Sequence, residues 1–516
     1  MKLRNSLVIL IAGFSLASNA QFRKLKKEER YENVNDSVVE RVVSYEELPT
    51  VQETVPAVEE VIITKPEKTY SNSDSLVVRS IFDEALTNGK SYQQLSYLCK
   101  VIGKRITGSQ QAENALEWAQ REVGKYGVDR VYMQSVEAQH WIRGDKEWVA
   151  ISEDIDMLLS ACALGGSVST DGPLQADVIE LSGIDDLKNY NVGDFSGKIV
   201  FFNEAMDKRK INTFESYGAC VAQRYSGAAE AAKYGAVGVL VRSMTTLTDN
   251  FAHTGSMAYK EGIKKVPAAA ISTQDADILH QYLEDNGGTA TITMNLNCYT
   301  SKQPVMTHNL IAEIQGSDNP EQVVVFGAHI DSWDKGEGAH DDGAGTVQCM
   351  EVLRLFRKVG IRPRNTIRMV LYMNEENGNM GGKTYAERAK SAEESHICAI
   401  ESDRGGFSPR GFTIDGTAEQ IEQVASWEGL LEDYGLHFFK KGYGGVDIGP
   451  LKKEENLVNS NLFLMGLYPD SQRYFDYHHS DDDVFDNVNQ RELELGGASM
   501  AAMVYLVDKY WYLFSK

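Results

Sequence analysis

Three segments of the chain are mainly apolar and alternate with stretches of helical pattern. This alternation limits the possible fold classes more than any other feature of the sequence. They are 323–330 (VVVFGAHI), 366–374 (TIRMVLYMN) and 397–403 (ICAIESD). Continuously apolar strands are typical of a sheet that helices cover on both faces. The sequence therefore predicts an α/β fold with a mixed, mostly parallel sheet sandwiched by helices.

Each of these predicted strands ends in residues that can bind a metal ion. His329 and Asp331 close the first segment, Glu375 and Glu376 follow the second, and Asp403 closes the third. Open α/β sheets bind ligands beyond the carboxyl ends of their strands. We therefore expect these three separate ends to converge on one site.

A pair of aspartates, Asp341 and Asp342, stands in GAHDDGAG just before a predicted helix. An aspartate there could cap the helix by accepting hydrogen bonds from its free N–H groups. The flanking glycines equally allow a sharp turn in which a carboxylate bridges two cations. The residues alone support both interpretations.

Two further pairs of adjacent residues could contribute to a metal site. Glu375 and Glu376 should point in different directions, which suits one as a ligand and the other as a general base, although a solvated turn explains them too. In YFDYHHSDDD, either His478 or His479 could be a ligand while the other packs or donates to the backbone.

A glycine-rich segment, 442–451 (GYGGVDIGPL), carries a candidate for substrate binding. Its Asp447 could contact the free amine of a peptide near the metals. An aspartate that stabilises a turn is an equally good interpretation.

Taken together, HID, GAHDDGAG, NEENG, ESD and YHHSDDD resemble, in their order and spacing, the M28 family of co-catalytic zinc peptidases. The likeness runs from about residue 77 to the C-terminus. Within the family the chain resembles most the carboxypeptidase Q-like branch, because of a predicted insertion similar to a protease-associated domain, an IGKRITGS-like helix start (102–109) and the double histidine. The resemblance implies a zinc-exopeptidase fold of the phosphorylase/hydrolase-like type.

The resemblance also implies a cofactor of two Zn²⁺ ions, with the metal ligands His329, Asp341, Glu376, Asp403 and His479. Asp341 would bridge both ions. His329 and Asp403 would complete one site, and Glu376 and His479 the other.

Further roles follow from the same resemblance. Glu375 would be the catalytic base that activates a zinc-bound water. Asp331 would support His329, because its carboxylate can accept a hydrogen bond from the second ring nitrogen of that histidine. Asp342 would follow Asp341 through a cis peptide bond. His479 is preferred to His478 because the family's ligand is followed by a hydroxyl residue and, four places on, by an aspartate, which here are Ser480 and Asp483. Val484 departs from the family's threonine.

The function implied is a co-catalytic di-zinc exopeptidase of the aminopeptidase or dipeptidase type, acting on small peptides with a free terminus. The alternatives are a carboxypeptidase acting on longer peptides, a glutaminyl cyclase-like enzyme and a non-catalytic binding protein. The resemblance also suggests a homodimer.

Composition excludes some classes of partner. Lysine and arginine number 52 against 74 aspartates and glutamates, which gives a formal net charge of −22. Such a surplus of acid repels phosphate backbones, so nucleic acid is not expected as a partner. The six cysteines are scattered singly and form neither a zinc knuckle nor a disulfide framework.

The chain divides into segments of different character. Residues 1–20 resemble a signal peptide, which predicts export to a periplasm or the medium, and 21–75 read as a linker or propeptide. The predicted peptidase domain comprises 76–160 and 296–516, with two helices within 75–127. Residues 161–295, with GKIVFF and GAAEAAKYGAVGVLV, resemble an inserted protease-associated domain. No later stretch is long and apolar enough for a membrane helix.

Overall fold

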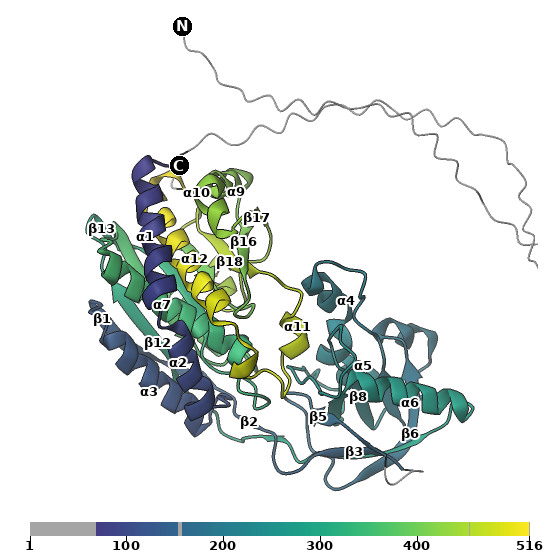
Figure 1. The fold of residues 1–516 in the computed structure, drawn as a ribbon. Coiled ribbons are helices and arrows are strands. Elements are labelled where there is room, and N and C mark those ends of the chain that lie inside the picture. The colour runs from purple at the N-terminus through teal and green to yellow at the C-terminus, as the bar shows by residue number, and fades with distance from the viewer. Residues whose placement is uncertain (1–68, 153–156, 454, 515–516) are drawn as a thin grey trace, which may run out of the picture. The chain divides into compact units, whose positions relative to one another are not determined.

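The computed structural model describes residues 69–152, 157–453 and 455–514. They form two eight-stranded sheets with their covering helices (Figure 1). The expected signal peptide (1–20) and nearly all of the expected linker (21–75) lie outside the described residues. No helix within the described ranges is long and apolar enough to cross a membrane.

The first sheet is the mixed sheet that the apolar segments predict. Its strand order is β1 (Arg130–Ala138), β12 (Val305–Ile314), β14 (Asn365–Tyr372), β13 (Asn319–His329), β15 (Ser395–Glu401), β18 (Phe463–Pro469), β16 (Pro409–Asp415) and β17 (Phe438–Lys441). The central strands β14, β13, β15 and β18 run parallel, whereas β1, β12 and β16 pair antiparallel with a neighbour. The predicted fold class is confirmed.

Both faces of this sheet are buried, which explains why its strands are apolar along their length. Val324 and Phe326 share one hydrophobic cluster with the helices α1 (Asn72–Asn88), α3 (Gln110–Gly124), α7 (Ala344–Val359) and α12 (Gln490–Lys509). Val323 and Val325 point to the opposite face and pack with α8 (Met380–Ser391). Alternating side chains of one strand therefore enter two different cores.

The N-terminal helical region differs from the prediction. Two helices were expected within 75–127, but the structure has α1, then α2 (Ser91–Tyr97) continuing into a π-helical turn (Leu98–Ile102), then α3. The apolar positions that guided the prediction, Leu95, Leu98 and Ile102 and then Ala112, Leu116, Trp118 and Val123, belong to α2 with its π-helical turn and to α3. The helix α1 ends at Asn88, and the N–H of the following Gly89 donates to the carbonyl of Ala85.

The second sheet has the order β4 (Leu158–Leu159), β3 (Trp148–Ile151), β10 (Thr291–Asn295), β6 (Leu174–Leu181), β7 (Ile199–Phe202), β8 (Gly238–Arg242), β9 (Ala268–Ile271) and β5 (Ala161–Ala163). Its helices are α4 (Thr213–Tyr225), α5 (Gly227–Lys233) and α6 (Thr273–Asp285). Because β3 and β4 pair within it, this sheet starts before the expected boundary at residue 161.

Shorter elements complete the described chain. The strands β2 (Trp141–Ile142) and β11 (Tyr299–Thr300) pair where the chain enters and leaves the second sheet. The remaining helices and turns are Ile184–Asn189, Ala339–Gly343, α9 (Ala418–Ala425), α10 (Glu428–Leu431), Glu432–Tyr434, Gly449–Lys452, α11 (Tyr474–Tyr477), Phe485–Asn487 and Trp511–Leu513.

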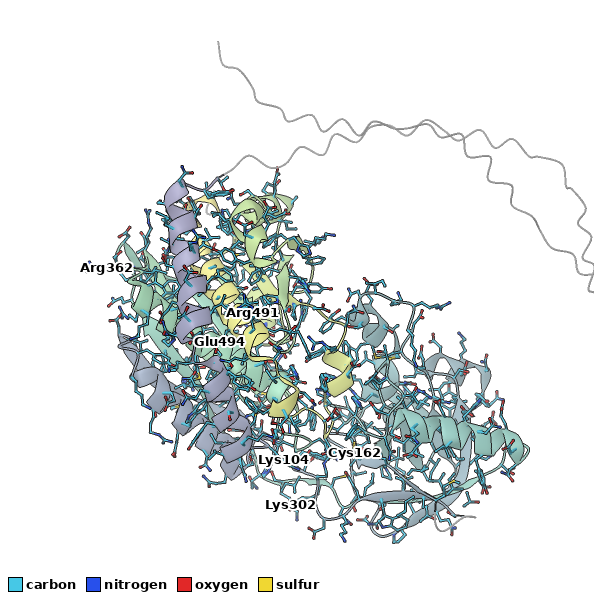
Figure 2. The ribbon with its side chains drawn as sticks, viewed as in Figure 1. Lys104, Cys162, Lys302, Arg362, Arg491 and Glu494 are labelled. Atoms are coloured by element: carbon cyan, nitrogen blue, oxygen red, sulfur yellow. The ribbon has the colours of Figure 1, made fainter. Side chains whose placement is uncertain are left out.

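All six cysteines are buried and free, in agreement with the absence of a predicted disulfide framework. Figure 2 labels one of them, Cys162, which lies in β5 of the second sheet.

A buried aspartate in α1 links the two ends of the first domain. Asp74 accepts hydrogen bonds from the hydroxyls of Tyr505 (2.6 Å) and Tyr510 (2.7 Å), and it pairs with Lys509. Burial alone would raise the pKa of Asp74, but these contacts, led by Lys509, outweigh burial and lower it below its usual value of 3.8.

We predict that Asp74→Asn lowers the free energy of unfolding by about 3 kcal/mol at pH 7, because it leaves Lys509 without its partner. A lowered pKa stabilises the fold above the unfolded value and loses its effect as pH falls, so the difference from wild type should narrow below about pH 4. Urea denaturation from pH 7 to pH 3 tests this. Asp83→Asn, on an exposed position of the same helix, should change little, and an equal loss at both positions would contradict the prediction.

Candidate metal centre

The carboxyl ends of the central strands meet as predicted. The strand β13 lies between β14 and β15 and runs parallel to both. His329 is its last residue, and the imidazole Nε2 lies 3.2 Å from Oδ1 of Asp341 and 3.5 Å from Oδ1 of Asp403. Two predicted ligands from distant segments therefore face His329.

Asp341 stands between two groups of side chains that could each hold a metal ion. The first group is His329, Asp341 and Asp403, and the second is Asp341, His478 and His479. Oδ2 of Asp341 lies 3.1 Å from Nε2 of His479 and 3.6 Å from Nε2 of His478. Asp341 is therefore a member of both groups of candidate ligands.

Glu376 joins the second group through His479, whose Nε2 lies 3.2 Å from Oε2 of the glutamate. The other oxygen of Glu376 accepts a hydrogen bond from the backbone N–H of Trp333 at 3.2 Å. His478 stacks on His479, with 3.5 Å between ring centroids, and its ring packs edge-on against Tyr217. His479 is the nearer of the two histidines to both carboxylates.

The outer ring nitrogens of both candidate histidines face backbone carbonyls. Nδ1 of His329 lies 3.0 Å from the carbonyl of Asp331, and Nδ1 of His479 lies 3.2 Å from the carbonyl of Thr254. A carbonyl can only accept, so Nδ1 carries a proton in each ring. Nε2 of each ring faces an oxygen of Asp341; it donates a hydrogen bond there when the ring is protonated and presents its lone pair when a metal ion lies between the two atoms.

Asp331 supports His329 in a different way from the one predicted. The prediction placed its carboxylate on the imidazole, but Oδ1 lies 3.7 Å from Nδ1 while the backbone carbonyl makes the contact. The buried carboxylate instead accepts hydrogen bonds from the hydroxyl of Thr107 (3.0 Å) and the N–H of Glu375 (3.2 Å). Asp331 therefore links the ends of β13 and β14.

Burial and the neighbouring carboxylates have opposite effects on the pKa values of the two candidate histidines. Burial would lower the pKa of His329, but hydrogen bonds to Asp341 and Asp403 raise it well above its usual value. Burial likewise opposes the rise in the pKa of His479, which Glu376 and Asp341 lift to about 9. Oδ2 of Asp341 is buried and makes no hydrogen bond with the described residues. These mixed imidazole and carboxylate donors fit zinc.

Glu375 is half-buried next to these groups, and its carboxylate makes no hydrogen bond with any residue in the described ranges. Burial and the negative charges of Asp403 and Glu376 raise the pKa of Glu375 well above its usual value. The side chain is therefore unengaged and surrounded by groups that favour its taking up a proton.

The two aspartates at 341 and 342 make different contacts, and Asp342 makes the contact with the helix start that one interpretation from the sequence expected. The peptide bond between them is cis. Asp341 faces the candidate ligands, whereas the carboxylate of Asp342 accepts hydrogen bonds from the N–H of Gly345 (2.9 Å) at the start of α7 and from that of His329 (3.3 Å). Asp483 holds the segment from the other side, accepting from the N–H of His340 (2.7 Å) and Asp341 (3.1 Å).

The IGKRITGS segment braces the loop between His329 and Asp341, a role that the sequence did not reveal. Arg105 is completely buried and donates to the carbonyls of Ile330 (2.9 Å), Glu337 (2.7 Å) and Gly338 (2.9 Å). One guanidinium therefore satisfies several carbonyls of an irregular loop that carries no secondary structure of its own.

The domain of the second sheet also contacts the candidate ligands. Thr254 donates its N–H to the carbonyl of His479 at 2.9 Å, and His253 donates from Nδ1 to the carbonyl of His478 at 2.7 Å. His479 has a left-handed φ of 63°, which these contacts help to hold. Sequence analysis missed both residues, because they lie 225 positions from the histidines they contact and belong to no motif.

Asp447 is buried, and neither of its carboxylate oxygens has a hydrogen-bond partner among the described residues. Hydrogen bonds to Glu401, a residue that sequence analysis also missed, hold the loop that carries Asp447. That carboxylate, two residues before Asp403, accepts from the N–H groups of Val446 (2.8 Å), Asp447 (3.0 Å) and Ile448 (2.9 Å).

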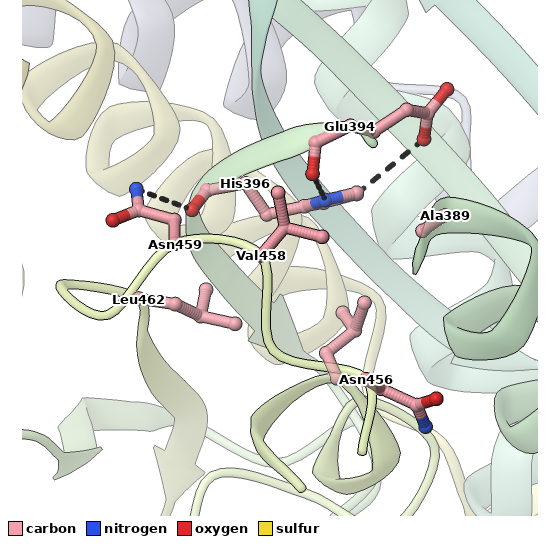
Figure 3. Close-up of a pocket in the computed structure, with 8 residues that line it drawn as sticks. Ala389, Glu394, His396, Asn456, Val458, Asn459 and Leu462 are labelled. Atoms are coloured by element: carbon pink, nitrogen blue, oxygen red, sulfur yellow. Dashed lines mark hydrogen bonds and ion pairs between the residues drawn. The ribbon is translucent and has the colours of Figure 1, made fainter. Parts of the chain in front are cut away.

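A small cavity elsewhere in the first domain is not part of this site. It has a volume of about 10 Å³ and lies between the end of α8, the start of β15 and the 456–462 loop (Figure 3). His396 and Asn459 are joined there by a hydrogen bond of 3.0 Å. Such a volume has room for about one water molecule.

Comparison with known proteins places this site in a family. Residues 309–504 match Peptidase family M28. The chain is 30% identical to carboxypeptidase Q of Bos taurus, over 84% of this chain and 88% of that protein, and 33% identical to carboxypeptidase Q of Xenopus laevis, over 85% and 91%. A solved peptidase M28 precursor from Shewanella amazonensis SB2B is 31% identical, with a TM-score of 0.78 and coverage of 86% of this chain and 97% of that chain.

The same fold occurs at lower identity in a zinc aminopeptidase from Bacillus subtilis, with 19% identity, a TM-score of 0.58 and coverage of 81% and 94%. The fold, the donor set and these relatives define a zinc metallopeptidase, a hydrolase of peptide bonds. The chain belongs to peptidase family M28, and carboxypeptidase Q is among its relatives. The predicted family is thereby confirmed.

We predict that Asp483→Ala weakens zinc binding about 10-fold to 100-fold, because the N–H groups that orient Asp341 lose their acceptor. Competition with a chromophoric chelator measures this. Asp483→Asn, which keeps one acceptor oxygen, should have a smaller effect. The neighbouring Asp482→Ala serves as the matched control, and an unchanged affinity in Asp483→Ala would contradict the role assigned to this residue.

Proposed function

We propose that the chain is a co-catalytic di-zinc exopeptidase that hydrolyses short peptides with a free terminus. The observation that carries the proposal is that Asp341 belongs to both groups of candidate ligands. His329 and Asp403 would hold one ion together with Asp341. Glu376 and His479 would hold the other, and the position of Asp341 between them suits it as the bridge.

When bound, the zinc ions supply Lewis acidity, which polarises the scissile carbonyl and lowers the pKa of the attacking water. In this proposal Glu375 accepts the proton from that water and delivers it to the leaving amine. Asp331 keeps Glu375 in place by accepting its backbone N–H. The chain thus divides the work between adjacent glutamates, with Glu376 as a ligand and Glu375 as the base.

Asp447 is the proposed contact for the free amine of the substrate. Its two buried oxygens lack partners, and the attachment of its loop to Glu401 holds them in place. An ammonium group would supply the missing counter-charge and donors.

We further propose that the second sheet and its helices form an inserted domain of the protease-associated type within a peptidase domain, with residues 161–295 as its expected extent. Export is proposed from the first 20 residues. A carboxypeptidase that releases C-terminal residues from longer peptides is the second candidate function, because the relatives named carboxypeptidase Q match over most of their length.

We predict that Glu375→Gln lowers kcat for peptide hydrolysis about 10²-fold to 10⁴-fold while zinc content stays at the wild-type level, since only the base is lost. Mass spectrometry of a mixture of dipeptides, longer peptides and end-blocked peptides measures activity. Elemental analysis measures zinc, with two ions per chain expected.

Glu376→Gln provides the matched comparison, because removing a proposed ligand should lower both zinc content and activity. Release of single C-terminal residues from long peptides would move the assignment to a carboxypeptidase. Full activity in Glu375→Gln would refute the assigned base.

We predict that Asp447→Asn raises KM about tenfold or more for peptides with a free amine and has little effect on peptides with an acetylated amine. Steady-state kinetics on such pairs of peptides measures the difference. Equal changes for free and acetylated peptides would show that Asp447 acts on the fold and not on the amine.

A further inference from the structure

A buried arginine beside the metal centre lacks a counter-charge. Arg224 lies in the last turn of α4 and is 7% exposed. Among the described residues its only hydrogen bond runs from Nη2 to the hydroxyl of Tyr217 at 2.7 Å, and the buried Nε has no partner there. No carboxylate of the described residues forms an ion pair with it. A buried guanidinium in this state is costly unless an anion joins it.

Other buried arginines in the described part of the chain are satisfied. Arg143, Arg354 and Arg368 pair with carboxylates, and Arg105 donates to backbone carbonyls. Two of the three guanidinium nitrogens of Arg224, Nε and Nη1, make no hydrogen bond with the described residues. Arg357 also leaves its Nε without a partner, but its Nη2 pairs with Asp129, whereas Arg224 has no carboxylate partner within the described part of the chain.

The contacts of Arg224 place it two side chains from the shared candidate ligand. Its partner Tyr217 packs edge-on against His478, with 5.4 Å between centroids, and Nε2 of His478 lies 3.6 Å from Asp341. On its other side the guanidinium lies directly on Gly255, where an added Cβ would be 2.5 Å from Cζ. Gly255 follows Thr254, whose carbonyl accepts from His479.

We infer that Arg224 binds the C-terminal carboxylate of the peptide substrate, on the residue that cleavage releases. The inference rests on the proposed function and narrows its substrate class. Every peptide with an unblocked C-terminus carries this anion, and the planar fork of arginine matches it in a charge-assisted pair. Because only Tyr217 and His478 separate Arg224 from Asp341 in this series of contacts, we assign the carboxylate to the residue next to the scissile bond.

This assignment gives the domain of the second sheet a role in selecting substrates. Its helix α4 supplies Arg224 and Tyr217, whereas the first domain supplies the candidate ligands. Peptides extended at the C-terminus would place an uncharged amide against a buried cation, which disfavours them. Peptides extended at the N-terminus would keep the carboxylate contact but lose the proposed contact between their free amine and Asp447, so the two contacts together favour dipeptides.

The test compares a dipeptide, alanyl-leucine, with its C-terminal amide on the zinc-loaded enzyme. Wild type should hydrolyse the acid with a kcat/KM about 100-fold above that of the amide. Arg224→Met should lower kcat/KM for the acid about 100-fold and leave the amide within about threefold. Arg209→Met is the matched control, since Arg209 is 90% exposed, lies in the same domain and pairs with Asp207.

A binding measurement separates the inference from turnover. In the Glu375→Gln background, calorimetric titration should show that the acid binds more tightly than the amide, and that Arg224→Met abolishes the difference. The zinc content and the thermal melting temperature of each variant show whether a loss of binding comes from a damaged metal centre or from a destabilised fold. Arg224→Lys, which keeps the charge but not the fork, should give an intermediate preference and serves if Arg224→Met does not fold.

An equal fall for acid and amide in Arg224→Met, or an unchanged preference in Arg224→Lys, would overturn the inference. Failure of the proposed function gives a different result, because wild type would then hydrolyse none of the peptides. In that case the titration still decides whether Arg224 recognises a terminal carboxylate.

Discussion

The candidate site depends on one constraint, the meeting of imidazoles and carboxylates around Asp341. Two imidazoles and several carboxylates face one another in a buried space, and such groups are costly to bury unless protons or metal ions balance their charges. The surrounding chain prevents these groups from turning away. Arg105, Asp483 and Thr254 each hold backbone rather than side chains, so the geometry of the donors is built into the main chain before any metal binds.

Much of the first domain and of the candidate site could be predicted because both follow from simple constraints. A strand buried on two faces is mainly apolar, and this pattern allowed β13 and β14 to be predicted as strands from the sequence. Parallel strands share a carboxyl edge, so polar residues at their ends had to meet there. His329 and Asp403 come together for this reason, although they are far apart in the chain.

What the sequence did not reveal depends on contacts without a local pattern. The carbonyl of Asp331, rather than its carboxylate, meets His329, and main-chain orientation has no signature in residue types. The clamp of His253 and Thr254 on the histidine pair joins segments with no shared periodicity. Arg224 could not be singled out either. An arginine in an amphipathic helix is common, and only the structure reveals that the buried Nε of this one has no partner among the described residues.

The clamp between the two domains also has a consequence for how the protein is made. His253 and Thr254 are synthesised long before His478 and His479, which follow 225 positions later. A nascent chain can fold the second sheet early, as domains do during translation, but the backbone carbonyls that His253 and Thr254 contact belong to a segment made near the end of synthesis. The metal centre therefore cannot be completed until nearly the whole chain has been made.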